Sequence, residues 1–265
     1  MNYSEAEKNI ANILRDSTII FNGQTKKILI AEKPIYASGE GKTDIYCRLD
    51  DGTEIKISYK KENADFLENK LSAKRAQEIF GESWKEILIN SIKPLIPLFE
   101  KSQIYFPEKK GRVSAGSYTM GWRCDFIKRK PIRNESLTTP LILTKEQKKE
   151  IFSGINLDSS KRNAKIIDTI IPNSGVANYF LTESTNENTA QGIINNLIPI
   201  GDVDIDIDIT FRRVNYRSIE DKIDGNRPLA VYVDWKNNKL IFNHPLEYGA
   251  KNDILKVFKE VKNIS

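Results

Sequence analysis

Apolar residues recur at helical spacing near the start of the chain and alternate with polar residues in the segments that follow. Residues 4–15 open with Ser4-x-x-Glu7, the pattern of a capping box, and place their apolar side chains on one stripe. Three later segments have the composition of strands: 26–32, 44–49 and 53–60. The pattern predicts a helix followed by three strands.

Beyond residue 60 the pattern mixes helices and strands. Helical spacing and capping residues predict further helices over 63–80, over 83–92, after Thr144 and over 160–171. From residue 199 the segment "DVDIDIDITFRRV" alternates at period two, and "LAVYVDWKNNKLIFNH" predicts a hairpin across Asn237 and Asn238. The fold class is therefore expected to be mixed α/β, with a β-rich C-terminal region.

The two strands around "DDG" (residues 50–52) are expected to form a hairpin with one polar and one apolar face. If Gly52 takes the left-handed conformation in a three-residue loop, Leu49 pairs with Thr53 and Asp44 falls opposite Ser58. Because side chains alternate across a strand, the charged and polar residues then share one face: Asp44, Glu54, Lys56, Ser58 and Lys60. The other face is expected to be core: Ile45, Cys47, Leu49, Ile55, Ile57 and Tyr59.

The letters GKT at residues 41–43 invite comparison with a phosphate-binding loop. Such a loop needs Gly-x-x-x-x-Gly-Lys-[Ser/Thr] between a strand and a helix, so that backbone N–H groups surround the phosphates. The residue five before Gly41 is Tyr36, and the segment after Thr43 is a predicted strand. The nucleotide-binding interpretation therefore fails on both sequence and context.

The hairpin resembles the PD-(D/E)xK nuclease superfamily, which contains most type II restriction endonucleases. Asp44 heads one strand, and either Glu54-Ile55-Lys56 or Ser58-Tyr59-Lys60 follows on the next. In that superfamily the aspartate and the acid of the second motif hold Mg²⁺, while the lysine lies beside the attacking water and the scissile phosphate. The resemblance covers roughly residues 1–80. It implies a restriction-endonuclease-like core, with a central mixed sheet flanked by helices.

The resemblance also implies a domain organisation and an enzymatic activity. Residues 1–100 are expected to form the catalytic core, and residues 101–265 a mixed α/β region that recognises DNA and completes the fold. The expected activity is Mg²⁺-dependent hydrolysis of phosphodiester bonds in DNA, as in a type II restriction enzyme of a restriction-modification system, with one or two ions bound. Palindromic targets make a homodimer natural, since two-fold protein symmetry mirrors two-fold site symmetry.

Two assignments of the second motif stay open. Glu54-x-Lys56 has the right residue types, but Glu54 lies four residues along the strand from Ser58, about 13 Å at a rise of ~3.3 Å per residue. Ser58-x-Lys60 lies opposite Asp44, as the second motif should, but it has serine where the motif has an acid. Some restriction enzymes supply this acid from another part of the chain. The carboxylates available for this are Glu62, Glu68 and Glu7, of which Glu7 resembles an additional helical glutamate of the superfamily.

The candidate catalytic residues are Asp44, Lys60, Ser58, Glu54, Lys56 and Glu7, and the candidate metal ligands are Asp44, Glu54 and Glu62. Hard oxygen ligands suit Mg²⁺, which polarises a phosphoryl group and lowers the pKa of its bound water. A lysine beside the phosphate offsets the negative charge that grows during the reaction.

Charge distribution is compatible with a nucleic-acid partner. The chain has 41 Lys and Arg against 36 Asp and Glu, a net charge of +5, and basic residues mix with apolar ones in "IKRKPIR" and "FRRVNYRS". Lys and Arg hold phosphates, and polar side chains read bases. The residues expected to contact double-stranded DNA are Arg112, Arg123, Lys128, Arg129, Arg212, Arg213 and Arg217.

Two other functions compete with the nuclease. A protein that keeps the fold without the chemistry, acting in DNA binding or host interaction, is favoured by the missing acid in Ser58-x-Lys60. A nucleotidyltransferase is the second alternative, because "GDVDIDIDI" carries Asp204 and Asp206 in an Asp-x-Asp pattern after Gly201. Such aspartates would hold Mg²⁺ for phosphoryl transfer.

Composition argues against histidine-based zinc sites, disulfide-bonded secreted proteins and membrane proteins. A single histidine, His244, excludes a histidine pair and a three-histidine zinc site. Two distant cysteines, Cys47 and Cys124, and the lack of a charged-then-apolar leader predict a cytoplasmic protein without disulfides. No apolar run approaches the ~20 residues that span a bilayer, so no membrane partner is expected.

Overall fold

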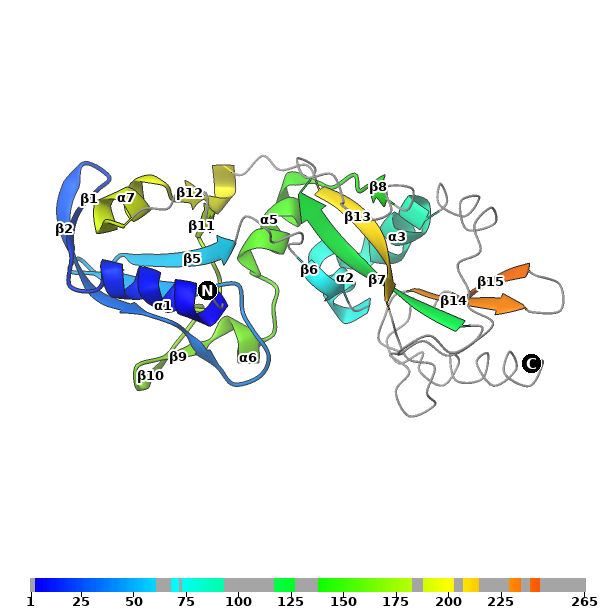
Figure 1. The fold of residues 1–265 in the computed structure, drawn as a ribbon, viewed down its shortest axis with the longest axis horizontal. Helices are drawn as coiled ribbons and strands as arrows, with labels where there is room; N and C mark the ends of the chain where they lie inside the picture. Colours follow the sequence, from blue (N-terminus) through cyan, green and yellow to red (C-terminus); the bar gives the residue numbers. More distant parts are fainter. Residues whose placement is uncertain are drawn as a thin grey trace. The chain divides into compact units, whose positions relative to one another are not determined.

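A computed structural model describes residues 3–60, 68–71, 73–92, 117–126, 138–182, 188–202, 207–214, 229–234 and 239–243 (Figure 1). The chain divides into two units, each built from two separate stretches. The first unit contains residues 1–64 and 145–204, and the second contains residues 65–144 and 205–265. These bounds differ from the expected division at residue 100, because a strand near residue 180 returns to complete the sheet that the N-terminal segment begins.

The first unit is built on a mixed six-stranded sheet, with strand order β1-β2-β4-β5-β11-β12. Its strands are β1 (Thr18–Phe21), β2 (Gln24–Glu32), β4 (Ile45–Leu49), β5 (Glu54–Lys60), β11 (Tyr179–Thr182) and β12 (Ile198–Pro199). The strands from β1 to β5 pair antiparallel in this order. β11 runs parallel to β5, and β12 runs antiparallel to β11. The predicted mixed α/β class is therefore confirmed.

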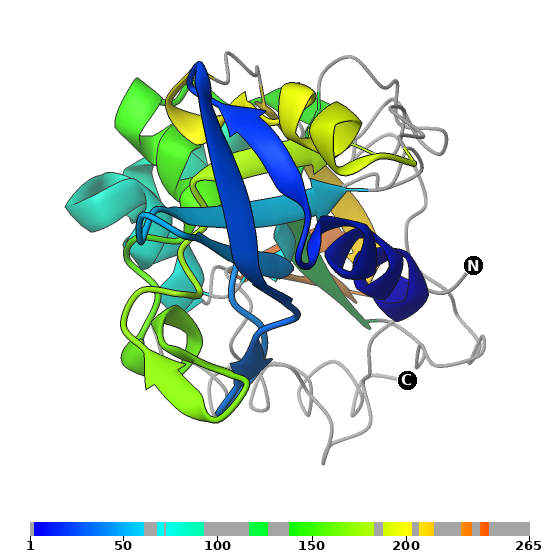
Figure 2. The ribbon, with the colours of Figure 1, turned by 90° about the vertical axis from the view of Figure 1, so that its left-hand side faces the viewer.

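Two helices bury one face of this sheet, α1 (Tyr3–Leu14) and α7 (Ala190–Asn195) (Figure 2). Leu14 of α1 and Ile193 of α7 belong to the same buried cluster as the apolar face of the hairpin. All the hairpin residues expected in the core are buried there: Ile45, Cys47, Leu49, Ile55, Ile57 and Tyr59. Burial of this apolar stripe, rather than helix propensity, is what holds α1 in place.

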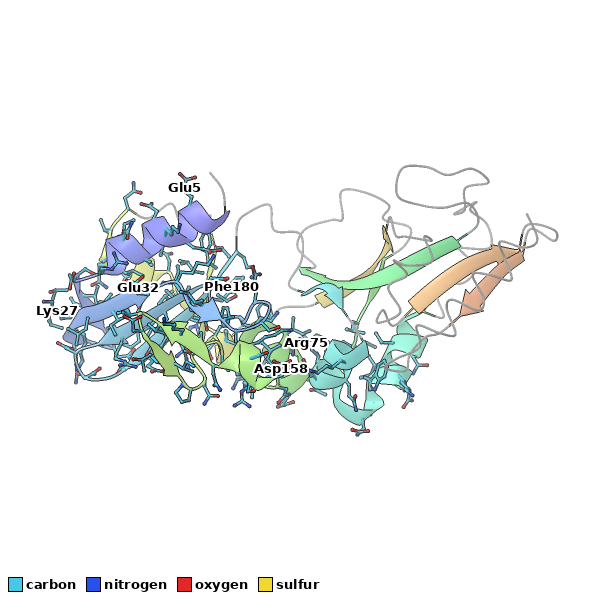
Figure 3. All side chains as sticks on the ribbon, turned by 90° about the horizontal axis from the view of Figure 1, so that it is seen from below. Glu5, Lys27, Glu32, Arg75, Asp158 and Phe180 are labelled. Carbon is cyan, nitrogen blue, oxygen red and sulfur yellow. The ribbon has the colours of Figure 1, made fainter. Side chains whose placement is uncertain are left out.

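The opposite face is covered by a second, smaller sheet and a helix. The small sheet has the order β10-β9-β3, formed by β10 (Thr169–Ile171), β9 (Ala164–Ile166) and β3 (Ile35–Tyr36). Ala164 and Ile166 pack against Tyr46, which is fully buried. Phe152 of α5 (Lys145–Ser153) meets Phe180 of β11 edge to face, with ring centroids 5.5 Å apart (Phe180 is labelled in Figure 3).

The prediction of a helix over residues 160–171 was wrong. Only α6 (Ser159–Arg162) is helical, and β9 and β10 follow it as a hairpin. This stretch is rich in β-branched residues, which lose side-chain freedom in a helix and pack well on a pleated strand. The short helix predicted after Thr144 is confirmed as α5.

The predicted register of the β4–β5 hairpin is confirmed. Ile45 pairs with Ile57 and Arg48 with Glu54, which puts residue 44 opposite residue 58. The Leu49 amide donates to the Thr53 carbonyl over 2.9 Å, and Gly52 has a φ of 86°, in the left-handed region that glycine adopts without strain. The three-residue loop thereby fixes which hairpin side chains face each other.

The second unit contains a sheet of order β15-β14-β7-β13-β8, with β6 also paired to β7. The strands are β6 (Glu68–Leu71), β7 (Ser117–Phe126), β8 (Thr138–Pro140), β13 (Ile207–Val214), β14 (Leu229–Asp234) and β15 (Lys239–Asn243), and the helices are α2 (Ala73–Phe80) and α3 (Trp84–Ile92). The predicted helix over 63–80 is confirmed for residues 73–80 and wrong for residues 68–71, which pair with β7 as a strand, while residues 63–67 lie outside the described residues. The C-terminal hairpin is confirmed, with Asp234 opposite Lys239, and its loop lies outside the described residues.

Candidate functional site

Asp44 and Lys60 lie beside each other at one end of the β4–β5 hairpin. Asp44 directly precedes β4, and Lys60 is the last residue of β5. The Lys60 Nζ is 3.9 Å from the Asp44 Oδ2, and the Tyr59 amide donates to the same oxygen over 2.7 Å. The Asp44 amide in turn donates to the Ile57 carbonyl over 2.8 Å. The hairpin register therefore holds the carboxylate in a fixed orientation next to the ammonium.

A second carboxylate and a second ammonium join this pair. Glu7 is buried on α1, whereas Glu5 on the same helix is exposed and points away from the sheet (Figure 3). The Lys33 ammonium, in the connection after β2, donates to the Glu7 Oε2. Glu7 is thus paired with a cation that comes from the segment after β2. We name these four residues the acid-lysine cluster: Glu7, Lys33, Asp44 and Lys60.

Burial raises the pKa of the Asp44 carboxyl above its ordinary value, and the positive charge of Lys60 opposes this rise. The Tyr59 amide also favours the ionised form, while the negative charge of Glu7 disfavours it. The Asp44 side chain keeps 26% of its exposed surface. Two carboxylates at close range, partly removed from water, favour a neighbouring cation, since like charges repel most strongly where water is scarce.

Tyr36 supports the residue that precedes Asp44. Its hydroxyl donates to the Thr43 carbonyl over 2.6 Å, and burial raises the pKa of that hydroxyl. The Thr43 amide donates to the Gly175 carbonyl, as does the amide of Lys42. The GKT stretch is thus tied down by backbone hydrogen bonds and leads into a strand, as expected for a loop that positions Asp44 and not for one that wraps a phosphate.

Glu54 and Lys56 form a separate polar cluster further along the hairpin. The Glu54 carboxylate accepts from the Tyr46 hydroxyl and lies 3.5 Å from Arg48 Nη2 and 3.7 Å from Lys56 Nζ. The alternative turn that would have brought Glu54 beside Asp44 is not the one observed. Ser58 lies opposite Asp44 as expected and is buried, at 2% exposure. The structure therefore brings together Asp44, Lys60, Ser58 and Glu7 among the candidates, and leaves Glu54 and Lys56 apart from them.

Several other candidates are not part of this site as described. Glu62, Arg112, Lys128, Arg129, Arg217, Asp204 and Asp206 lie outside the described residues. Glu68 is in β6, Arg123 is in β7, and Arg212 and Arg213 are in β13, all in the second unit. Lys33 and Tyr36 were not among the candidates, because no local pattern marks a residue that reaches the site through packing of α1 and β3.

The donor set of the acid-lysine cluster suits Mg²⁺. Among the residues that the structure describes, no three His, Cys, Asp or Glu side chains gather as a metal site. Mg²⁺ does not require three such ligands, because it keeps several waters and is commonly bound by one or two carboxylates together with substrate phosphates. Asp44 and Glu7 would be those carboxylates. Zinc, which prefers nitrogen and sulfur ligands, does not fit this oxygen-only set.

Comparisons of the chain with protein-family models, with curated proteins and with solved structures find no match. In the parts of the chain that are described, no helix has the length and apolar character needed to cross a membrane. What the site does must therefore be inferred from its own residues.

Proposed function

We propose that this chain is a Mg²⁺-dependent DNA endonuclease with a restriction-endonuclease-like core, acting as a type II restriction enzyme does. One observation carries the proposal: Asp44 and Lys60 are 3.9 Å apart, and Glu7 is close enough to raise the Asp44 pKa. The resemblance of the hairpin to the PD-(D/E)xK pattern supports the same activity. So does the mixed sheet, which packs against α1 on one face and α5 on the other.

Each residue of the cluster has a role in this proposal. Asp44 and Glu7 hold Mg²⁺, which supplies polarisation of the phosphoryl group and a water of lowered pKa when it is bound. Lys60 contacts the scissile phosphate and offsets the negative charge that develops on it. The Tyr59 amide keeps the Asp44 Oδ2 oriented, so little reorganisation is needed when the substrate arrives.

Ser58 occupies the position where the superfamily has its second acid. Its side chain is neutral, so it leaves the cluster one carboxylate short of the family pattern. Glu7 compensates for that loss from α1, where it is buried and ion-paired with Lys33. The second metal ligand would thus come from a helix and not from β5.

Lys60→Ala is expected to lower DNA cleavage about a hundredfold or more, because the charge that forms on the phosphate loses its nearest cation. Lys56→Ala, two residues earlier on the same strand, is expected to cleave at nearly the wild-type rate. Both variants and the wild type would be incubated with mixed-sequence plasmid and Mg²⁺, with EDTA as the blank. Equal loss in both variants, or greater loss in Lys56→Ala, would restore Glu54-x-Lys56 as the second motif.

Tyr36→Phe is expected to lower the cleavage rate about tenfold with little change in DNA affinity, because the Thr43 carbonyl loses its donor and Asp44 is positioned less well. Loss of this hydrogen bond is also expected to cost about 1 kcal/mol of stability. Single-turnover cleavage, which separates the chemical step from binding, measures the first effect. An unchanged cleavage rate would show that the Tyr36 hydroxyl does not help to position Asp44.

A second candidate is a DNA-binding protein that has the fold but does not cut. Ser58, which stands where the superfamily has its second acid, favours it. It predicts a shifted but uncut plasmid in the same digest. Discrete fragments that appear with Mg²⁺ and vanish with EDTA would exclude it.

A further inference from the structure

Lys33 reaches the acid-lysine cluster from a loop, and not from the hairpin that carries Asp44 and Lys60. It lies between β2 and β3, and its ammonium donates to the Glu7 Oε2. The Lys33 side chain is 42% exposed, whereas the Glu7 side chain is 8% exposed. The pair therefore joins a buried carboxylate to an ammonium on a flexible side chain that has open access to solvent.

The backbone on both sides of this pair is held in place. Pro34 is buried, and its ring restricts the preceding Lys33 to an extended backbone. Arg15, directly after α1, donates to the Ala31 carbonyl over 3.1 Å and to the Glu32 carboxylate over 2.8 Å. These contacts tie the end of α1 to the end of β2. Breaking the ion pair therefore requires movement of the lysine side chain alone.

The formal charges of the acid-lysine cluster cancel without a metal ion, because two carboxylates face two ammonium groups. The negative charge of Glu7 and the positive charge of Lys33 both act on the Asp44 carboxyl. A divalent ion beside these carboxylates would be repelled by Lys33, since like charges interact strongly where water is scarce. If Lys33 leaves when Mg²⁺ binds, and one phosphate arrives beside Lys60, the charges cancel again.

We propose that Lys33 is a resident counter-ion of the site: its ammonium takes the cation position beside Glu7 when no metal is bound, and its side chain moves into solvent when Mg²⁺ binds. The inference rests on the proposed nuclease function, because it takes Glu7 as a metal ligand. Lys33 is then a positioning residue, since the ion pair keeps the Glu7 carboxylate oriented toward the cluster. It also limits Mg²⁺ affinity, because the pair must break before the ion can bind.

Two substitutions of Lys33 are expected to change metal affinity in opposite directions. Lys33→Met keeps the length of the side chain and removes its charge, so metal affinity is expected to rise about tenfold. The metal-free variant is expected to unfold at a lower temperature than the wild type, because Glu7 is left buried without a cation. Lys33→Arg keeps the charge and offers the carboxylate two donors, so metal affinity is expected to fall.

Titration with Mn²⁺ followed by electron paramagnetic resonance, with Mg²⁺ as competitor, measures this affinity without DNA or cleavage. Lys26→Met is the matched control, because Lys26 is a lysine of the same unit that pairs with another carboxylate, Asp51, over 2.8 Å. Its metal affinity is expected to equal that of the wild type. In a Glu7→Gln background the gain from Lys33→Met is expected to be much smaller, because the pair is already absent.

Asp44→Asn separates the counter-ion role from the metal site itself. Mn²⁺ binding that Asp44→Asn abolishes, and that Lys33→Met leaves unchanged or weakens, would overturn the counter-ion role and leave the proposed nuclease standing. Tighter binding by Lys33→Arg would also overturn it, and this variant decides the question if Lys33→Met does not fold. Tighter Mn²⁺ binding by Lys33→Met without cleavage by any of the proteins would support the counter-ion role and refute the nuclease. Absence of Mn²⁺ binding in wild type and Lys33→Met alike would refute both.

Discussion

Replacing Asp44 with asparagine is expected to lower Mg²⁺-dependent DNA cleavage by about 10²–10³-fold and to raise the thermal unfolding midpoint at neutral pH. Cleavage falls because asparagine carries no charge with which to hold Mg²⁺ beside Glu7. The midpoint rises because Asp44 is partly buried and close to a second carboxylate, so its ionised form is disfavoured in the folded state. Asparagine keeps the shape and still accepts from the Tyr59 amide.

The pH dependence of both effects follows from the raised pKa of Asp44. A group whose pKa is higher in the folded than in the unfolded state stabilises the fold below its unfolded pKa, and this contribution disappears as pH rises through the folded pKa. The advantage of Asp44→Asn should therefore be largest at neutral pH and should shrink in acid. Cleavage by the wild type should decline, as pH falls, at a higher pH than an ordinary aspartate would produce.

Thermal unfolding of wild type and Asp44→Asn, with and without Mg²⁺, would check this prediction. Mg²⁺ is expected to raise the midpoint of the wild type, since an ion that binds only the folded state stabilises it, and to have a much smaller effect on the variant. Asp168→Asn is a suitable control, because that carboxylate is on the surface and away from the acid-lysine cluster. The proposed site would be contradicted if Asp44→Asn unfolded at a lower temperature than the wild type at neutral pH and if Mg²⁺ raised the unfolding midpoints of both proteins equally.

Gly175→Ala is expected to destabilise the first unit by about 3 kcal/mol or more and to reduce cleavage as well. A Cβ on Gly175 would lie 2.0 Å from the Lys161 carbonyl oxygen and 3.0 Å from that of Arg162, and backbone atoms cannot move aside cheaply. The Gly175 carbonyl also accepts from the amides of Lys42 and Thr43, directly before Asp44. A shift of this strand connection would therefore displace Asp44, the proposed metal ligand.

The control for this substitution is Gly201→Ala. A Cβ on Gly201 would meet no heavy atom within 4 Å, so the change in midpoint should be small. Thermal and urea unfolding of the two variants would be compared with single-turnover cleavage. A Gly175→Ala protein as stable as Gly201→Ala would mean that the close packing of residue 175 against the 161–162 backbone is not maintained in solution.

The parts of the fold that were predicted correctly are those fixed by local chemistry. The loop of residues 50–52 needed a left-handed residue, and Gly52 supplied it, so the register and the pairing of residue 44 with residue 58 followed. The apolar alternation of β4 and β5 likewise identified the buried face before the helices that cover it were known. This was enough to place Asp44 and Lys60 together.

The parts that were missed depend on contacts between distant segments. Nothing near Lys33 in the sequence marks it as a partner of Glu7, because the pair forms only when α1 packs on the sheet. Helical spacing over residues 63–80 was a real pattern, yet residues 68–71 pair with β7, some fifty residues later, and become a strand. Tertiary pairing of this kind overrides local preference.

The pairing of β5 with β11 has a consequence for how the chain folds during synthesis. On the edge of β5 that faces β11, the backbone groups of residues 57–60 stay unpaired until residues 179–182 have been synthesised. Residues 65–144, which belong to the second unit, are synthesised in between. Until then β5 is an open edge, which is a template for association with other chains. A ribosome-bound or truncated product that stops near residue 100 would therefore be aggregation-prone, because its β5 edge still lacks β11.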